Sequence, residues 1–119
     1  MKVIGIIGSR RRNEPADFEA VRKVVMEIYH KGDRFVSGGC RQGGDKFCEY
    51  LARDLGAPIM IYHADWNGLG KSAGFARNTS IAQDAGILVA CVSPDRTGGT
   101  EDTIKKFQAL KPNNPLIIV

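Results

Sequence analysis

The sequence lacks any hydrophobic run long enough to cross a membrane. Its longest apolar segments, such as residues 87–92 and 116–119, fall far short of the about 20 residues that a bilayer-spanning helix requires. Residues 1–7 resemble the start of a signal peptide, but three arginines follow at positions 10–12, where an apolar stretch and a cleavage site would be needed. We therefore expect a cytosolic protein with no membrane partner.

Cysteine is also scarce, with three residues in the chain. Cys40, Cys48 and Cys91 are odd in number, and they form neither a C-x-x-C motif nor a zinc-type spacing with His30 or His63. The pattern argues against a disulfide framework and against a metal site. We expect three reduced thiols, no bound metal and no resident cofactor.

The excess of positive charge is small, because 17 Lys and Arg residues against 13 Asp and Glu residues give a net charge of +4 in 119 residues. With 43% hydrophobic and 25% charged residues, the composition is that of one ordinary globular domain covering residues 1–119. This weak basicity fits a protein that binds small anions as well as one that binds nucleic acid. The sequence shows neither a basic helix nor a row of aromatic residues for base stacking, so nucleic acid ranks last among the candidate partners.

Short apolar strands alternate with amphipathic helices along the chain. The first helix opens at Pro15 and places Val21 and Val25 on one face, and Phe47 and Leu51 mark the inner face of a second helix. The expected strands are residues 2–7, 34–36, 59–62, 87–92 and 116–119.

Two further helices are expected after a long loop over residues 63–72. The third is expected to turn Ala76 and Ile81 inward, and the fourth to be capped by Thr100 and to bury Leu110. Five strands with four intervening helices predict an α/β fold of three layers, a Rossmann-like parallel sheet with helices on both faces.

Glycine is over-represented, and its distribution distinguishes the two edges of the predicted sheet. Three of the 14 glycines lie in helix-to-strand turns, namely Gly32, Gly56 and Gly86. Ten are assigned to the carboxyl edge: Gly8, Gly38, Gly39, Gly43, Gly44, Gly68, Gly70, Gly74, Gly98 and Gly99. Seven cationic residues fall on the same edge: Arg10, Arg11, Arg12, Arg41, Lys71, Arg77 and Arg96. Since ligands of such sheets bind at the carboxyl edge, this combination predicts a site for a phosphorylated ligand.

Two loops of this edge carry more specific patterns. Gly8-Ser9-Arg10 follows the first strand, where its hydroxyl and guanidinium can contact phosphate or ribose, while Arg11 and Arg12 are interpreted as solvated. The segment 37–45 matches neither the G-x-G-x-x-G fingerprint nor a P-loop, and it is interpreted as a phosphate or ribose cradle. Asp45 either accepts a hydrogen bond from a ribose, acts as a polar catalyst, or stabilises the helix N-terminus.

The segment 63–78 concentrates aromatic and charged side chains at the same edge. Its Trp66 either stacks on a base or packs as a lid, and packing is favoured because the chain has one Trp. Lys71 and Arg77 are candidate phosphate ligands.

A phosphate seat is also expected after the fourth strand. Gly98-Gly99-Thr100 opens the last helix, so its N–H groups and hydroxyl can hold an anion. Glu101 and Asp102 either lie beyond that anion or one of them has a chemical role.

Taken in series, these motifs resemble the SLOG superfamily, the Rossmann-like group that contains DprA and the LONELY GUY phosphoribohydrolases, and within it the small YspA-related proteins. The matching segments are Gly8-Ser9-Arg10, Gly38-Gly39-Cys40-Arg41, Gly44-Asp45, Ala64-Asp65-Trp66, Gly70-Lys71, Ala73-Gly74, Arg77-Asn78 and Gly98-Gly99-Thr100. The resemblance implies that the protein binds or senses a nucleotide or nucleotide-derived ligand and that it forms a homo-oligomer.

The same resemblance implies an alternative function, hydrolysis of the N-glycosidic bond of a nucleoside monophosphate or a related compound. In that interpretation Arg77 holds the phosphate or assists the departing base, and Asp45, Glu101 or Asp102 supplies the carboxylate, since Thr103 stands where the phosphoribohydrolases carry their glutamate. The residues expected to bind the ligand under either function are Gly8, Ser9, Arg10, Gly38, Gly39, Arg41, Gly44, Asp65, Trp66, Lys71, Arg77, Asn78, Gly98, Gly99 and Thr100.

Overall fold

A parallel sheet of five strands forms the centre of the protein. The computed structural model describes residues 1–119, apart from the side chain of Lys71. The strands are β1 (Val3–Gly8), β2 (Arg34–Ser37), β3 (Ile59–Ile61), β4 (Ile87–Cys91) and β5 (Leu116–Ile118). Their order is β3-β2-β1-β4-β5, and every neighbouring pair is parallel. The expected parallel sheet is therefore confirmed.

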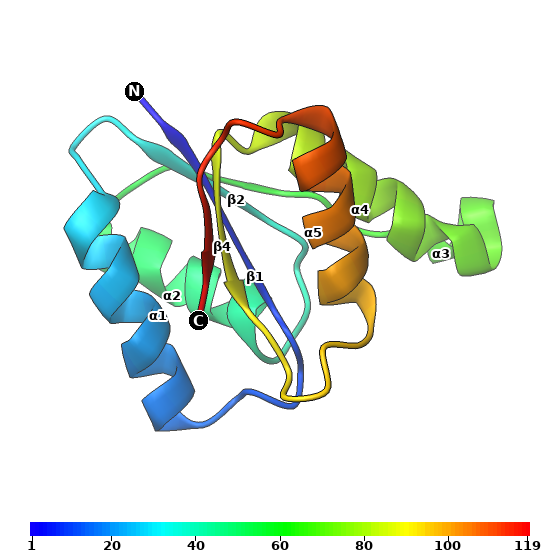
Figure 1. Ribbon diagram of the computed structural model, residues 1–119, viewed down its shortest axis with the longest axis horizontal. Helices are drawn as coiled ribbons and strands as arrows, with labels where there is room; N and C mark the ends of the chain where they lie inside the picture. Colours follow the sequence, from blue (N-terminus) through cyan, green and yellow to red (C-terminus); the bar gives the residue numbers. More distant parts are fainter.

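Helices cover both faces of this sheet. One face carries α1 (Pro15–Ile28) and α2 (Gly44–Leu55), and the other carries α4 (Ala73–Asp84) and α5 (Gly99–Leu110) (Figure 1). This arrangement is the three-layer, Rossmann-like α/β fold that the alternating pattern predicts. Within the described part of the chain, no helix combines the length and the apolar character that crossing a bilayer requires.

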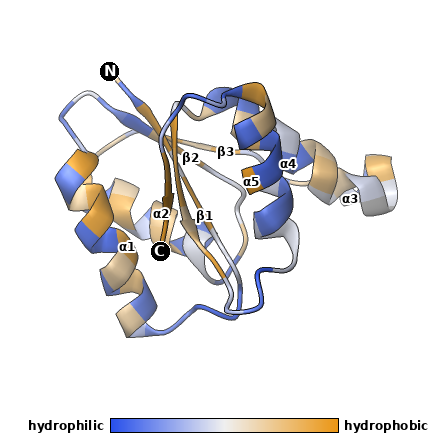
Figure 2. Cartoon of the chain, viewed as in Figure 1, coloured by the Kyte–Doolittle hydropathy of each residue, from blue (hydrophilic) through white to orange (hydrophobic). Residues whose placement is uncertain are grey.

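The core has two halves because alternate strand residues point to opposite faces. Ile4 and Ile6 of β1 pack in one half with Val21 of α1, whereas Ile7 packs in the other half with Phe107 of α5. Figure 2 shows the resulting hydrophobic strands between helices of mixed character. Burial on both faces explains why the strands are apolar without alternation.

The expected loop over residues 63–72 contains regular structure instead. A short helix, α3 (Trp66–Leu69), is followed by a 3₁₀ turn, η1 (Gly70–Ser72). The Asp65 carboxylate accepts a hydrogen bond from the Gly68 N–H at 2.9 Å, and this cap starts the helix. The structure therefore has five α-helices in the described residues rather than the four expected.

Three finer expectations, about the faces of α4 and α5 and the N-cap of α5, were wrong. Ala76 is exposed because the buried residues of α4 are Ala73, Asn78, Ile81 and Ala82, and at about 100° per residue Ala76 lies on the opposite side of the helix. Leu110 is 51% exposed, since two steps of three residues from Ile104 rotate its side chain about 120° away from the core. The N-cap of α5 is Gly98 rather than Thr100.

The first turn of α2 touches the backbone of β1 directly. A Cβ atom on Gly44 would meet the Ile7 carbonyl and the Gly8 nitrogen more closely than any real Cβ contact. The Gly43 N–H donates to Asn13 Oδ1 at 2.8 Å, so the connection between β1 and α1 is tied to the same point. Glycine at position 44 therefore sets the distance between α2 and the sheet.

We expect Gly44→Ala to lower the free energy of unfolding by about 1–3 kcal/mol or more. The reason is that neither α2 nor β1 can move without disturbing the sheet. Urea unfolding followed by circular dichroism measures the change.

Gly86→Ala is the matched control for this substitution. Its nearest atom would be the Val3 carbonyl oxygen at 3.6 Å, an ordinary contact, so its stability should change by less than about 1 kcal/mol. Equal losses in the two variants would contradict the role assigned to Gly44.

Candidate functional site

The strand order reverses between β1, the central strand of the sheet, and its neighbour β4. From β1 the chain continues to β2 and β3 on one side, and from β4 to β5 on the other. The connections that follow β1 and β4 meet at the lower edge of the view in Figure 1. A cleft of about 600 Å³ opens at this edge, the usual place for a ligand in such a sheet.

Segments from every part of the carboxyl edge line this cleft. Its lining residues are Ile7, Gly8, Ser9, Arg10, Arg11, Gly38, Gly39, Cys40, Asp45, His63, Ala64, Trp66, Arg77, Asn78, Ile81, Thr97, Gly98, Gly99, Thr100 and Thr103. Of the residues that the sequence singled out, the structure brings these together: Gly8, Ser9, Arg10, Gly38, Gly39, Asp45, Trp66, Arg77, Asn78, Gly98, Gly99 and Thr100.

Three of the residues expected to bind the ligand do not line the cleft. Arg41 is exposed outside it, Gly44 packs against β1, and Asp65 caps α3 with its carboxylate. A fourth, Lys71, cannot be placed, because its side chain lies outside the described part of the structure.

The two acidic residues in the first turn of α5 also lie outside the cleft lining. Glu101 forms a bidentate ion pair with Arg96, at 2.8 and 3.0 Å. Asp102 accepts hydrogen bonds from Lys106 at 2.9 Å and from Asn78 at 3.1 Å. Both carboxylates are thus neutralised by neighbouring groups next to the N-terminus of the helix.

Arg77 is held in the wall of the cleft by two hydrogen bonds. Its Nη1 donates to the Gly38 carbonyl at 2.8 Å, and its Nε donates to Asn78 Oδ1 at 3.0 Å. Asn78 is buried and donates in turn to the Gly99 carbonyl at 3.3 Å, which links α4 to the start of α5. A Cβ at Gly38 would lie 2.8 Å from Arg77 Nη1, so a side chain there would displace the guanidinium.

Asp45 is the one carboxyl among the described residues of the cleft lining, and it is almost completely buried. Its Oδ2 accepts the Cys40 N–H at 3.1 Å, and its Oδ1 lies 2.9 Å from Ser37 Oγ. Ser37 Oγ also lies 2.6 Å from the Ile6 carbonyl oxygen. Because a serine hydroxyl has one proton, it cannot donate to both oxygens at once.

Burial sets the direction in which the pKa of Asp45 moves. It raises this pKa above its ordinary value and outweighs the opposing effects of the Cys40 N–H, the Ser37 hydroxyl and the Arg77 charge. Through its contacts with Ser37 and the Cys40 N–H, the carboxyl braces the loop after β2.

The N-terminus of α5 forms one end of the cleft. Its N-cap, Gly98, has a φ of 99°, which favours glycine, and no side chain caps the helix. The first N–H groups therefore face the cleft without a side-chain partner from the described residues. Gly99 and Thr100 line the same end.

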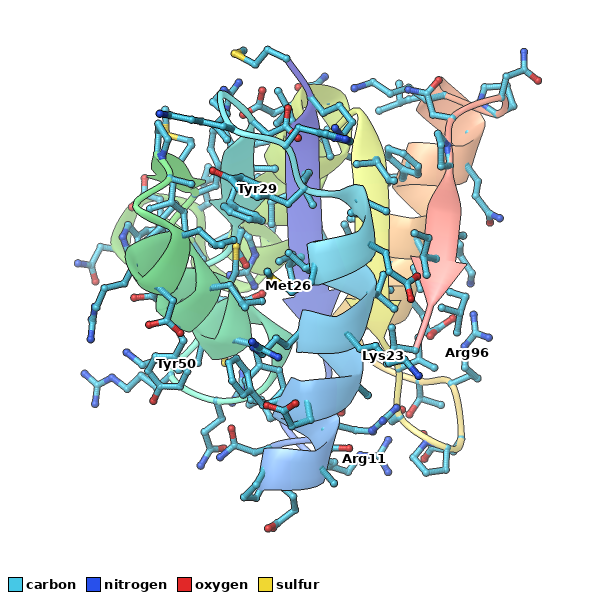
Figure 3. The ribbon with its side chains drawn as sticks, turned by 90° about the vertical axis from the view of Figure 1, so that its left-hand side faces the viewer. Arg11, Lys23, Met26, Tyr29, Tyr50 and Arg96 are labelled. Atoms are coloured by element: carbon cyan, nitrogen blue, oxygen red, sulfur yellow. The ribbon has the colours of Figure 1, made fainter. Side chains whose placement is uncertain are left out.

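The three consecutive arginines after β1 have different environments. Arg10 is exposed on the cleft, and among the described side chains it has no ion-pair partner. Arg11 lines the cleft and pairs with Asp95 of the loop after β4, and Figure 3 shows Arg11 and Arg96 at that end of the molecule. Arg12 was wrongly interpreted as solvated, because it is half-buried and donates to Asp17 and to the carbonyls of Val92 and Val119.

Several cleft residues were missed at the sequence level. Thr97 directly precedes Gly98, and Thr103 lies one helical turn after Gly99, so both follow from the glycine pair. His63 lies at the start of the connection from β3 to α3, and a Cβ on Gly39 would lie 2.8 Å from its Nδ1. The position of His63 directly after the expected strand over residues 59–62 would have been the signal for it.

The described residues contain no group of three or more His, Cys, Asp or Glu side chains placed to hold a metal ion. Comparison of the chain with protein-family models, with curated proteins and with solved structures gave no match. The functional conclusions therefore rest on the geometry of the cleft.

The raised pKa of Asp45 has a measurable consequence for stability. A folded-state pKa above the unfolded value of 3.8 means that the folded state of the protein binds the proton more tightly, so its stability falls as the pH rises above about 4. Asp45→Asn keeps an acceptor for Cys40 and a donor for Ser37 but carries no charge. We expect the stability of this variant relative to the wild type to increase from pH 4 towards pH 7 in urea unfolding.

Asp33→Asn is the control of opposite sign. Burial acts to raise the pKa of Asp33, but the hydrogen bonds and charge of Lys2 and the His30 N–H lower it below the ordinary value. Its ionised form therefore adds stability above pH 4 that is lost as the pH falls. Asp33→Asn should cost about 1–3 kcal/mol at pH 7 and progressively less in acid. Parallel pH dependences of the two variants would contradict the raised pKa of Asp45.

Proposed function

We propose that this protein binds a nucleotide or nucleotide-derived ligand in the cleft, with a phosphate group at the N-terminus of α5. One observation carries the proposal: the uncapped start of α5 and the exposed Arg10 face the same cleft at the point where the strand order reverses. An open helix N-terminus with a nearby guanidinium is suited to a phosphate group.

The charges around this end favour an anion. Arg10, Arg11 and Arg77 line the cleft, while Glu101 and Asp102 are already paired with Arg96 and Lys106. The carboxylates next to the seat therefore pair with cations outside the cleft. Of the lining cations, Arg11 is paired with Asp95, whereas Arg10 has no ion-pair partner among the described side chains. A phosphate bound there meets a positive local potential although the whole chain carries only +4.

The size of the cleft supports a ligand larger than inorganic phosphate. A volume of about 600 Å³ is within the range of sites for small organic ligands. Hydroxyl and amide groups from Ser9, Asn78, Thr97 and Thr100 are distributed along it, so a sugar hydroxyl has partners. These features and the motif resemblance together support a nucleotide over a simple anion.

Binding or sensing is favoured over hydrolysis. Cleavage of an N-glycosidic bond needs a carboxylate or carboxylic acid that can reach the bond. Among the described residues of the lining, Asp45 is the one carboxyl, and both of its oxygens are occupied by Ser37 and Cys40. Glu101 and Asp102 are held outside the lining by their ion pairs.

Thermal unfolding with a panel of nucleoside monophosphates, ADP-ribose and nicotinamide dinucleotide tests the proposed function. A ligand present at 100 times its dissociation constant should stabilise the protein by about 2.7 kcal/mol. Absence of a shift with every member of the panel would contradict nucleotide binding.

Arg10→Ala should weaken the binding of the active nucleotide by about 10- to 100-fold, because a charge-assisted hydrogen bond to phosphate is lost. Isothermal titration calorimetry measures the change. Arg22→Ala is the control, since it removes the same charge from an exposed side chain of α1 away from the cleft. If both variants weaken binding equally, the effect is one of net charge and Arg10 is not a ligand.

A further inference from the structure

Trp66 is a large aromatic residue that the core does not use. It is the single Trp of the chain, it is 58% exposed, and it lines the cleft as the first residue of α3. No residue of α3 is buried, so Trp66 is not part of the core. Its exposure at the ligand cleft therefore needs a reason other than stability.

The position of the indole is set by local contacts. The Asp65 carboxylate caps α3 through the Gly68 N–H, and the Gly70 N–H donates to the Trp66 carbonyl. A Cβ on Gly74 of α4 would lie 3.4 Å from Trp66 Cη2, so the benzo ring lies beside the start of that helix. The ring is held on one side by α4 and is accessible from the cleft.

The two ends of the cleft differ in chemistry and lie well apart. Trp66 follows β3, whereas the phosphate seat follows β4, and β2 and β1 lie between these strands. Three spacings of about 4.8 Å separate β3 from β4 by about 14 Å in the sheet. Figure 1 shows α3 projecting from the body beyond α4, on the side away from β5. A ligand that reaches both ends must be elongated, with an anion at one end.

We propose that Trp66 is the platform on which the base of the bound ligand stacks, so that the cleft selects nucleotides over sugar phosphates of the same charge. The inference rests on the proposed function and adds the residue that recognises the base. Every base has a π-face, so stacking on an indole fits a ligand class rather than one base. The Asp65 carboxylate next to it is turned to its cap and does not line the cleft.

Two neighbouring residues provide matched comparisons. Leu69 of α3 is 49% exposed and Phe75 in the first turn of α4 is 59% exposed, but neither lines the cleft. Lys106 Nζ lies 5.4 Å from the centroid of the Phe75 ring, outside the cleft. If exposure alone explained Trp66, these two residues would behave in the same way.

Intrinsic fluorescence tests the platform directly, because all Trp emission of this protein comes from Trp66. The wild-type protein is titrated with AMP, ADP-ribose and nicotinamide dinucleotide, and in parallel with ribose 5-phosphate, while calorimetry gives the affinities. We expect the nucleotide that binds to quench the emission and ribose 5-phosphate to leave it unchanged.

Trp66→Ala should weaken nucleotide binding by about 5- to 100-fold, and Trp66→Phe should retain most of the affinity. Binding of ribose 5-phosphate should be the same in the wild type and both variants. Leu69→Ala and Phe75→Ala should leave both affinities unchanged. Since Trp66 contributes nothing to the buried core, urea unfolding should show all four variants folded with wild-type stability.

The outcomes separate the platform from the proposed function. If a nucleotide binds but Trp66→Ala does not affect it, or weakens ribose 5-phosphate equally, the platform is wrong and nucleotide binding stands. If Leu69→Ala and Phe75→Ala weaken binding as much as Trp66→Ala, and the mass in solution falls with them, the segment is an interface between copies and the platform is again wrong. If no nucleotide binds the wild type, both proposals fail.

Discussion

The contact between the backbone of α2 and the end of β1 determines the geometry of one whole wall of the cleft. Gly44 has no side chain between the helix and the strand, so the next residue, Asp45, reaches the loop after β2. Asp45 braces that loop through the Cys40 N–H, and the loop in turn presents the Gly38 carbonyl to Arg77. A helix displaced by one side chain would lengthen each of these contacts in series. The position of the Arg77 guanidinium on α4 thus depends on the absence of a side chain at Gly44 of α2.

Asp45, Glu101 and Asp102 are each either buried or paired with a cation, which leaves the lining of the cleft with a positive charge. Asp45 is buried, which raises its pKa and favours the neutral acid. Glu101 and Asp102 remain on the surface but are paired with Arg96 and Lys106. Desolvating an unpaired carboxylate beside a phosphate would cost several kcal/mol, and none of the three presents that obstacle. Local pairing therefore decides the sign of the potential at the site, which the net charge of the chain does not.

The periodic pattern of hydrophobic residues was sufficient to predict the fold. The site was predicted less completely, because the sequence does not show in which direction a loop side chain points. The strands were correct to within one residue at each end, because runs such as 87–92 are buried on both faces and bounded by glycine or proline. Sorting residues by sheet edge brought Gly8, Arg77 and Gly98 to one cleft, since parallel topology places all strand-to-helix loops together. It could not show that the Arg12 side chain turns back to bind Asp17, because neighbouring loop residues with the same charge have no periodicity.

The helix α3, which follows β3, is not constrained by core packing as the other helices are. Residues in the two core halves are constrained by packing, as the buried stripe of α4 shows, and their identity carries information about stability. The helix α3 has no buried residue, and its shape is fixed by the Asp65 cap and by backbone hydrogen bonds. A small polar residue at position 66 would satisfy those contacts equally well. The indole of Trp66 is therefore constrained neither by burial nor by the cap of α3, which is why the proposed base platform is assigned to it and not to the core.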